Sequence, residues 1–216
     1  MKKYNYLNLL FIAPFLLGLY VAINDGIVYP FEKALFDALR VLAPYADIPM
    51  RAITELGSAV GVICVTVLIV VISAIKKHFT DFGLPVALTV IISRIINITL
   101  KNVLDRPRPE FKVLEASESS FPSGHSQNNM ALYIAILLVA LLISKAPKGR
   151  LALKISCIVL PVIIGITRVY FGVHYISDVI AGWSIGVIVA YNIHYFYFRF
   201  IYPLFAVKEK TENEVS

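Results

Sequence analysis

Long apolar runs dominate this sequence, and they constrain its fold more than any other feature. Of its 216 residues, 58% are hydrophobic and only 16% are charged. A helix needs about 20 mostly apolar residues to cross the hydrocarbon core of a bilayer. An open strand would leave backbone groups unpaired in lipid. The sequence therefore predicts an all-α integral membrane protein.

Six stretches approach the length of a membrane-spanning helix. They cover residues 7–23, 57–75, 83–103, 126–144, 151–170 and 177–198. The first stretch follows two lysines, as a signal peptide would, but it contains Pro14 and lacks a small-x-small cleavage site before Asn24. We expect it to remain as a membrane helix. The sequence thus predicts a six-helix membrane domain over 1–206 and a polar cytoplasmic tail over 207–216.

The segment from Pro30 to Ala43, between the first two stretches, is too short and too charged to cross a membrane. Its apolar residues recur at helical spacing, and its charged residues fall on the other faces. This pattern predicts a short amphipathic helix lying in the membrane interface. Such a helix would be either a connector packed on the bundle or an element that gates a site.

The positions of lysine and arginine predict the orientation of the bundle. With the N-terminus in the cytoplasm, eleven of them lie inside and eight outside, and a function described next explains three of those eight, Lys101, Arg108 and Arg168. Because cytoplasmic loops are enriched in these residues, the remaining bias of eleven to five predicts cytoplasmic N- and C-termini. The ends of the third and fifth stretches and the starts of the fourth and sixth then meet at the outer face.

Three motifs fall at these helix ends: KNVLDRPRP from Lys101, PSGH from Pro122 and TRVYFGVHYISD from Thr167. Three of their bases, Lys101, Arg108 and Arg168, can together hold the negative charges of a phosphate monoester. Each base alone has a simpler explanation, because it could complement a helix terminus or extend to water. The prediction of a phosphate site depends on their joint occurrence.

Two histidines in the motifs predict the chemistry. His174 and Asp178 lie four residues apart, on one helix face if the helix has begun by His174. The acid would hold one imidazole nitrogen and leave the other free to attack, so His174 is the candidate nucleophile. His125 is the candidate acid for the leaving oxygen. Ser123 and Gly124 begin the next helix, where they offer amides to an anion or form a plain N-cap.

The motifs resemble those of the type 2 phosphatidic acid phosphatase family. KNVLDRPRP matches KxxxxxxRP, PSGH is unaltered, and TRVYFGVHYISD matches SRxxxxxHxxxD except that Thr167 replaces serine. The resemblance is strongest to small bacterial phosphatidylglycerophosphate and undecaprenyl-pyrophosphate phosphatases, and it implies metal-independent hydrolysis through a phosphohistidine. It would assign phosphate binding to Lys101, Arg108, Ser123, Gly124 and Arg168, the acid to His125, the nucleophile to His174 and its orientation to Asp178.

These features set the expected substrate and partners. A site at the outer ends of membrane helices meets headgroups, so we expect a lipid phosphate, with phosphatidylglycerophosphate ranked first and undecaprenyl pyrophosphate second. The family resemblance implies that the membrane is a bacterial cytoplasmic membrane. No metal ion is expected, since HExxH, CxxC and carboxylate clusters are absent from the sequence. We also expect no cofactor and no nucleic acid. The oligomeric state is left open. An anion transporter or lipid-binding protein is the alternative class, although docking an anion needs no nucleophile.

Arg94 is the one charged residue well inside a predicted span. It precedes Lys101 by two helical turns, so both lie on one face of the third stretch. A charge there is costly unless it faces a polar interior, so we expect Arg94 to point into the bundle. It would either contact substrate or be held by buried carbonyls or an acid. The second interpretation is preferred, and it predicts that Arg94→Leu lowers stability more than substrate affinity.

Overall fold

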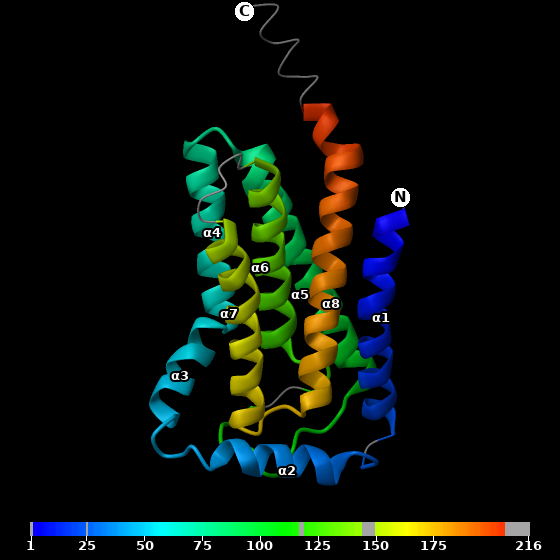
Figure 1. Cartoon of the computed structure of the whole chain (residues 1–216), viewed down its shortest axis with the longest axis vertical. Coiled ribbons are helices and arrows are strands. Elements are labelled where there is room, and N and C mark those ends of the chain that lie inside the picture. Colours follow the sequence, from blue (N-terminus) through cyan, green and yellow to red (C-terminus); the bar gives the residue numbers. More distant parts are fainter. Residues whose placement is uncertain (1, 25, 117–118, 144–149, 206–216) are drawn as a thin grey trace, which may run out of the picture.

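The computed structural model is an all-helical bundle in the residues that it describes, 2–24, 26–116, 119–143 and 150–205. In these ranges the α-helices are α1 (Lys2–Ile23), α2 (Tyr29–Arg40), α3 (Asp47–Leu56), α4 (Ala59–Ile75), α5 (Leu84–Leu104), α6 (Gly124–Ile143), α7 (Arg150–Tyr170) and α8 (Ile176–Phe196). Two π-helical turns, η1 (Phe79–Gly83) and η2 (Tyr197–Ile201), precede α5 and follow α8. The long helices stand side by side, and α2 lies across one end of the bundle (Figure 1).

All six apolar stretches form helices, but not all of them meet the length and composition of a membrane span. In the described part of the chain, four segments do: Phe79–Leu104, Gly124–Leu142, Arg150–Tyr170 and Ile176–Phe205. A fifth span results if α3 and α4, which are bent by 49°, cross together. Helix α1 contributes a shorter apolar segment, Asn8–Ile23. The bundle thus has four or five candidate spans, and six spans stay a prediction; the expected polar tail lies outside the described residues.

Helix α3 is not expected from the sequence, because its charged residues interrupt any apolar run. The second stretch was expected to begin at Gly57, whereas the chain is already helical from Asp47. Ser58 starts the next helix, since its side chain accepts a hydrogen bond from the amide of Gly61 at 3.2 Å. A Cβ on Gly57 would lie 2.3 Å from Cγ2 of Ile164. Glycine is therefore required where this corner packs on α7.

Close packing of α6 against α8 depends on two glycines of α8. A Cβ on Gly182 would lie 2.8 Å from the carbonyl oxygen of Ser123, and one on Gly186 would lie 2.6 Å from that of Gln127. Any side chain at these positions would push the two helices apart. The glycines therefore hold the beginning of α6, with the PSGH motif, directly on the beginning of α8.

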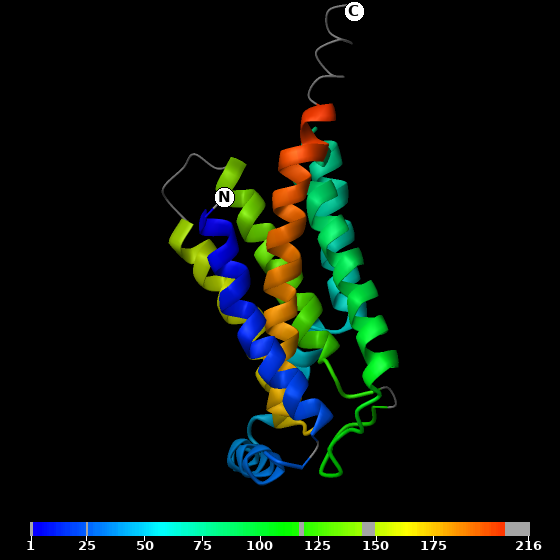
Figure 2. The same ribbon diagram turned by 90° about the vertical axis from the view of Figure 1, so that its right-hand side faces the viewer.

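Helix α2 is attached to the bundle by a buried carboxylate. Figure 2 shows α2 end-on, below α1 and α8. Glu32 of α2 is 3% exposed, and it accepts hydrogen bonds from the amide and Oγ of Ser177 at 3.2 and 2.5 Å. Nη2 of Arg106 lies 3.5 Å from Oε2 of Glu32. These contacts hold α2 on the bundle, and its place in a membrane interface stays a prediction.

We predict that Glu32→Ala destabilises the protein more than Asp37→Ala on the same helix. The first change leaves the amide and Oγ of Ser177 without their buried acceptor, which costs about 1–3 kcal/mol, and it removes one of the two carboxylates beside Arg106. The Lys33–Asp37 ion pair is exposed, and such pairs contribute about 0–1 kcal/mol. Thermal unfolding of the purified protein in detergent would measure both variants. Equal melting temperatures would show that Glu32 does not hold α2.

The sidedness predicted from charge can be tested at two exposed lysines, Lys112 after α5 and Lys76 at the end of α4. They lie at opposite ends of the bundle. Single cysteines at these positions, in a Cys64→Ala, Cys157→Ala background, would be treated in intact cells with a membrane-impermeant thiol reagent. We expect labelling at position 112 and none at position 76. The reverse pattern would invert the topology.

Candidate active site

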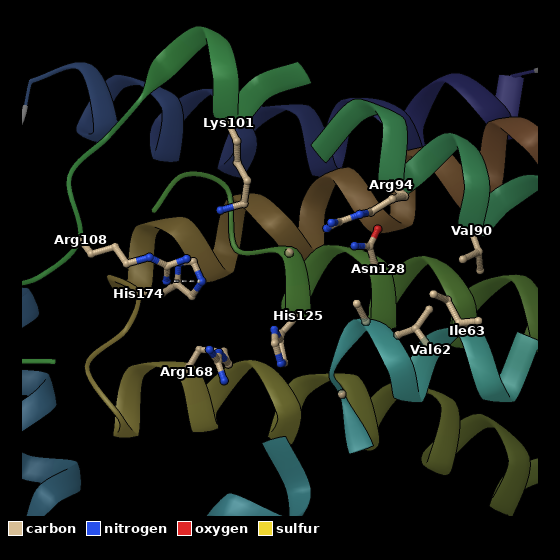
Figure 3. A pocket seen from close by; sticks show the side chains of 13 residues that line it. Val62, Ile63, Val90, Arg94, Lys101, Arg108, His125, Asn128, Arg168 and His174 are labelled. Atoms are coloured by element: carbon tan, nitrogen blue, oxygen red, sulfur yellow. Dashed lines mark hydrogen bonds between the residues drawn. The ribbon is translucent and has the colours of Figure 1, made fainter. Parts of the chain in front are cut away.

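The three motifs come together around one cavity of about 250 Å³ at the end of the bundle that α2 covers (Figure 3). Its polar wall consists of Lys101 from α5, Arg108 from the following loop, Gly124 and His125 from α6, Arg168 from α7 and His174 from the loop before α8. Its apolar wall comes from α4 and α5. The structure thus brings six of the eight predicted site residues to a single space.

His174 is buried, with its two ring nitrogens directed at different partners. Nδ1 lies 3.5 Å from Oδ2 of Asp178 and 3.4 Å from Oγ of Ser120. Nε2 lies 3.3 Å from Nη1 of Arg108, on the side of the cavity (Figure 3). A proton on Nδ1 would face the carboxylate and leave the lone pair of Nε2 toward the bases. This is the arrangement required of a nucleophile.

The surroundings of His174 also favour its uncharged form. Burial lowers the pKa of His174 to about 3; the positive charges of Arg108 and Arg168 act in the same direction, and Asp178 opposes them. Only the unprotonated imidazole can attack phosphorus. His174 therefore meets this requirement at neutral pH. An anion bound between the bases would offset part of their charge and raise this pKa.

Asp178 lies behind His174 and is fully buried. Its Oδ1 accepts a hydrogen bond from Nη1 of Arg106 at 2.6 Å. Its Oδ2 accepts hydrogen bonds from Oγ of Ser120 at 2.5 Å and from the amide of Tyr175 at 3.0 Å. A buried carboxylate needs such partners to remain ionised. They hold it facing the imidazole.

Arg106 and Ser120 belong to the candidate site through their contacts with Asp178, although no motif pattern singles them out. Arg106 occupies a variable position of KxxxxxxRP, and its place between Lys101 and Arg108 is the only signal that it gives. In the structure it is 3% exposed, and its guanidinium lies 4.0 Å from the ring centroid of Tyr175. Ser120 gives no local signal, because it reaches Asp178 only through the folding of the loop after α5.

The three bases are each held by an acceptor of the protein. Nζ of Lys101 donates to the carbonyl oxygen of Ser119, and Nη1 of Arg108 donates to that of Val173 at 2.7 Å. Nη1 of Arg168 donates to Oγ1 of Thr54 on α3 at 2.6 Å, and its buried Nε has no hydrogen-bond partner among the described residues. These contacts position the three bases at the wall of the cavity.

Ser123 lies behind the wall of the cavity rather than on it. Its Oγ accepts hydrogen bonds from the amide and Oγ of Ser126 at 3.4 and 2.9 Å, and its own amide donates to the carbonyl oxygen of Asp178 at 3.1 Å. Ser123 is thus an N-cap, the simpler of the two interpretations of PSGH. The amides of Gly124 and His125 are in the first turn of α6, where amides have no partner within the helix.

Arg94 lines the cavity below Lys101, beside Asn128 (Figure 3). This position inside the bundle is the predicted one. Its guanidinium forms no hydrogen bond or ion pair with any residue that the structure describes. The expected acid or carbonyl partner is therefore missing from the described chain, which favours the interpretation in which Arg94 contacts a ligand.

Known proteins resemble this chain in both sequence and fold. The model of the PAP2 superfamily matches residues 82–202. Over 181 residues the chain is 34% identical to phosphatidylglycerophosphatase B of Bacillus subtilis, covering 81% of this chain and 87% of that protein. It is also 36% identical over 109 residues to lipid A 1-phosphatase of Rhizobium etli, covering 45% of this chain and 43% of that protein.

Two crystal structures resemble the bundle. The transmembrane PAP2 type phosphatidylglycerolphosphate phosphatase from Bacillus subtilis superposes with a TM-score of 0.78 at 29% identity, over 93% of this chain and 98% of that one. Aquifex aeolicus LpxE superposes with a TM-score of 0.56 at 24% identity, over 73% of this chain and 92% of that one, which shows a shared fold. By its sequence match and by its relatives, this chain belongs to the PAP2 superfamily, the family that its three motifs resemble.

Proposed function

We propose that this chain removes the terminal phosphate of a phosphatidylglycerophosphate-type lipid through a phosphohistidine at His174. Its class, a membrane lipid phosphatase, follows from family membership and from the similarity to phosphatidylglycerophosphatase B over most of the chain. The observation that supports the mechanism best is the environment of His174. Its imidazole is uncharged, with Asp178 beside Nδ1 and Arg108 beside Nε2.

Binding of the phosphate comes first. Lys101, Arg108 and Arg168 surround the space in front of His174, where their charges act together on an anion. The amides of Gly124 and His125 add the positive end of α6. Together these groups neutralise the phosphate, which otherwise repels an approaching nucleophile.

Two displacements then complete the reaction. Nε2 of His174 attacks phosphorus, the bond to the lipid oxygen breaks, and His125 protonates that oxygen as it leaves. Asp178 stabilises the positive charge that develops on the imidazole of His174. In the second step His125 takes a proton from water, the water oxygen attacks the phosphohistidine, and inorganic phosphate leaves. Both histidines return to their starting states.

The shape of the cavity supports a lipid as the substrate. Beyond the polar wall, the cavity is lined by Val62 and Ile63 of α4 and Val90 of α5. Its volume of about 250 Å³ suits a phosphorylated headgroup, so the hydrocarbon chains would remain in the bilayer. The bacterial relatives and the apolar helices support a cell membrane protein. We place the site at the outer face on the basis of the charge bias.

We predict that His174→Ala lowers turnover by at least about a thousandfold, because it removes the nucleophile. Lipid binding should persist, since Lys101, Arg108 and Arg168 remain. Release of phosphate from phosphatidylglycerophosphate in micelles and binding of the same lipid would be measured on purified protein. His78→Ala is the matched control, because His78 is exposed and outside the cavity. A His174→Ala variant with the wild-type rate would disprove the assignment.

A second prediction concerns metal ions and oxyanions. The three bases supply the charge neutralisation that a metal ion supplies in other phosphatases. We therefore expect full activity in EDTA, and inhibition by vanadate that competes with the lipid for the basic cavity. Initial rates at several lipid concentrations would measure both effects. Loss of activity in EDTA that a divalent ion restores would contradict the mechanism.

A further inference from the structure

Arg94 places a positive charge in the cavity away from the reacting groups. It lies seven residues before Lys101 on α5, so the two positions are separated by about 10 Å along the helix axis. Figure 3 shows Lys101, Arg94 and Val90 following one another along this helix. A lipid bound with its terminal phosphate at the bases would therefore pass Arg94 before its chains reach the apolar wall.

Asn128 supplies a second polar group at the same depth. Asn128 is only 8% exposed, and its Oδ1 accepts a hydrogen bond from Oγ of Ser93 at 2.9 Å. This bond turns the amide so that Nδ2 points into the cavity beside Arg94 (Figure 3). Nδ2 has no hydrogen-bond partner among the described residues. Arg94 and Asn128 thus present donors, and no acceptor, to the same part of the cavity.

An anion or a strong hydrogen-bond acceptor would satisfy these donors. A guanidinium at membrane depth is costly when it has no counter-charge, and a buried amide group is costly when it has no acceptor. A ligand oxygen between them would satisfy both groups. The two side chains lie between the basic wall and the apolar wall, so that oxygen must belong to the part of a lipid that joins its terminal phosphate to its chains.

We propose that Arg94 and Asn128 form a subsite for the internal phosphodiester of the substrate. The inference rests on the proposed function and specifies its substrate. In a phosphatidylglycerophosphate a glycerol bridge separates the internal from the terminal phosphate, so the diester can reach Arg94. Phosphatidate has only uncharged esters at this position. In a polyprenyl pyrophosphate, a single bridging oxygen keeps the second phosphate beside the bases. The subsite therefore selects lipids with two separated phosphates.

The test compares Arg94→Gln with the wild type on phosphatidylglycerophosphate and phosphatidate of the same chains, in the same mixed micelles. We expect the ratio of kcat/KM for the two lipids, diester over phosphatidate, to fall about tenfold, as for a lost charged hydrogen bond. The loss should appear in KM rather than kcat, and Arg94→Lys should recover part of it. Arg51→Gln, which changes an exposed arginine of α3, should leave the ratio unchanged.

Asn128→Asp gives an independent measurement if Arg94→Gln does not fold. Aspartate keeps the acceptor for Ser93, but its charge would repel a diester and neutralise Arg94, so the same ratio should fall. A ratio that stays at the wild-type value in the folded variants would overturn the subsite. Stimulation of phosphatidate hydrolysis by added phosphatidylglycerol would also overturn it, because the pocket would then hold a separate lipid.

The two proposals fail in different ways. If the wild type hydrolyses both lipids and His174→Ala hydrolyses neither, but Arg94→Gln lowers both kcat/KM values equally, the proposed function stands and the phosphodiester subsite is wrong. If the wild type releases phosphate from neither lipid, the proposed function is wrong and the subsite is wrong with it. A lower melting temperature with an unchanged ratio would restore the structural interpretation of Arg94.

Discussion

A buried charge within a lipid-embedded bundle must find its partner inside the protein, and the contact between Arg106 and Asp178 is the clearest case here. Arg106 comes from the loop after α5, and Asp178 from the first turn of α8. Glu32 brings α2 to the same guanidinium. One arginine therefore joins three segments that are distant in sequence. The arrangement of the end of the bundle that holds the candidate site depends on this cluster.

The same constraint organises the candidate active site around this cluster. Because Arg106 and Ser120 occupy the oxygens of Asp178, the carboxylate cannot turn away from His174. Between α5 and α6, Nε2 of Gln127 donates to the carbonyl oxygen of Ser93, and Oε1 of Gln127 accepts a hydrogen bond from Nδ2 of Asn97. These polar pairs hold α5 and α6 together where lipid offers no hydrogen bonds. The bases and histidines thus stand on elements that are locked before substrate arrives.

Much of this could be predicted from local patterns. Long apolar runs predict the six long helices, and Pro30 predicts the start of α2. Both signals are local, because each lies within the helix that it predicts. The motifs give most of the cavity wall for the same reason, since each is short and lies at a helix end. Helix α3 could not be predicted in this way. Its charged residues interrupt the apolar run that identifies a span, and it is set by packing against α7.

The sequence by itself therefore determined the helical membrane bundle, the meeting of three motifs at one end and the pairing of His174 with Asp178, because these follow from hydrophobicity and spacing along the chain. Only the tertiary structure decided which groups surround them. It assigned Ser123 to capping α6, placed Arg106 behind Asp178 and left Arg94 without a partner in the described chain. Hydrogen-bond partners and burial depend on segments far apart in sequence, which no local pattern encodes.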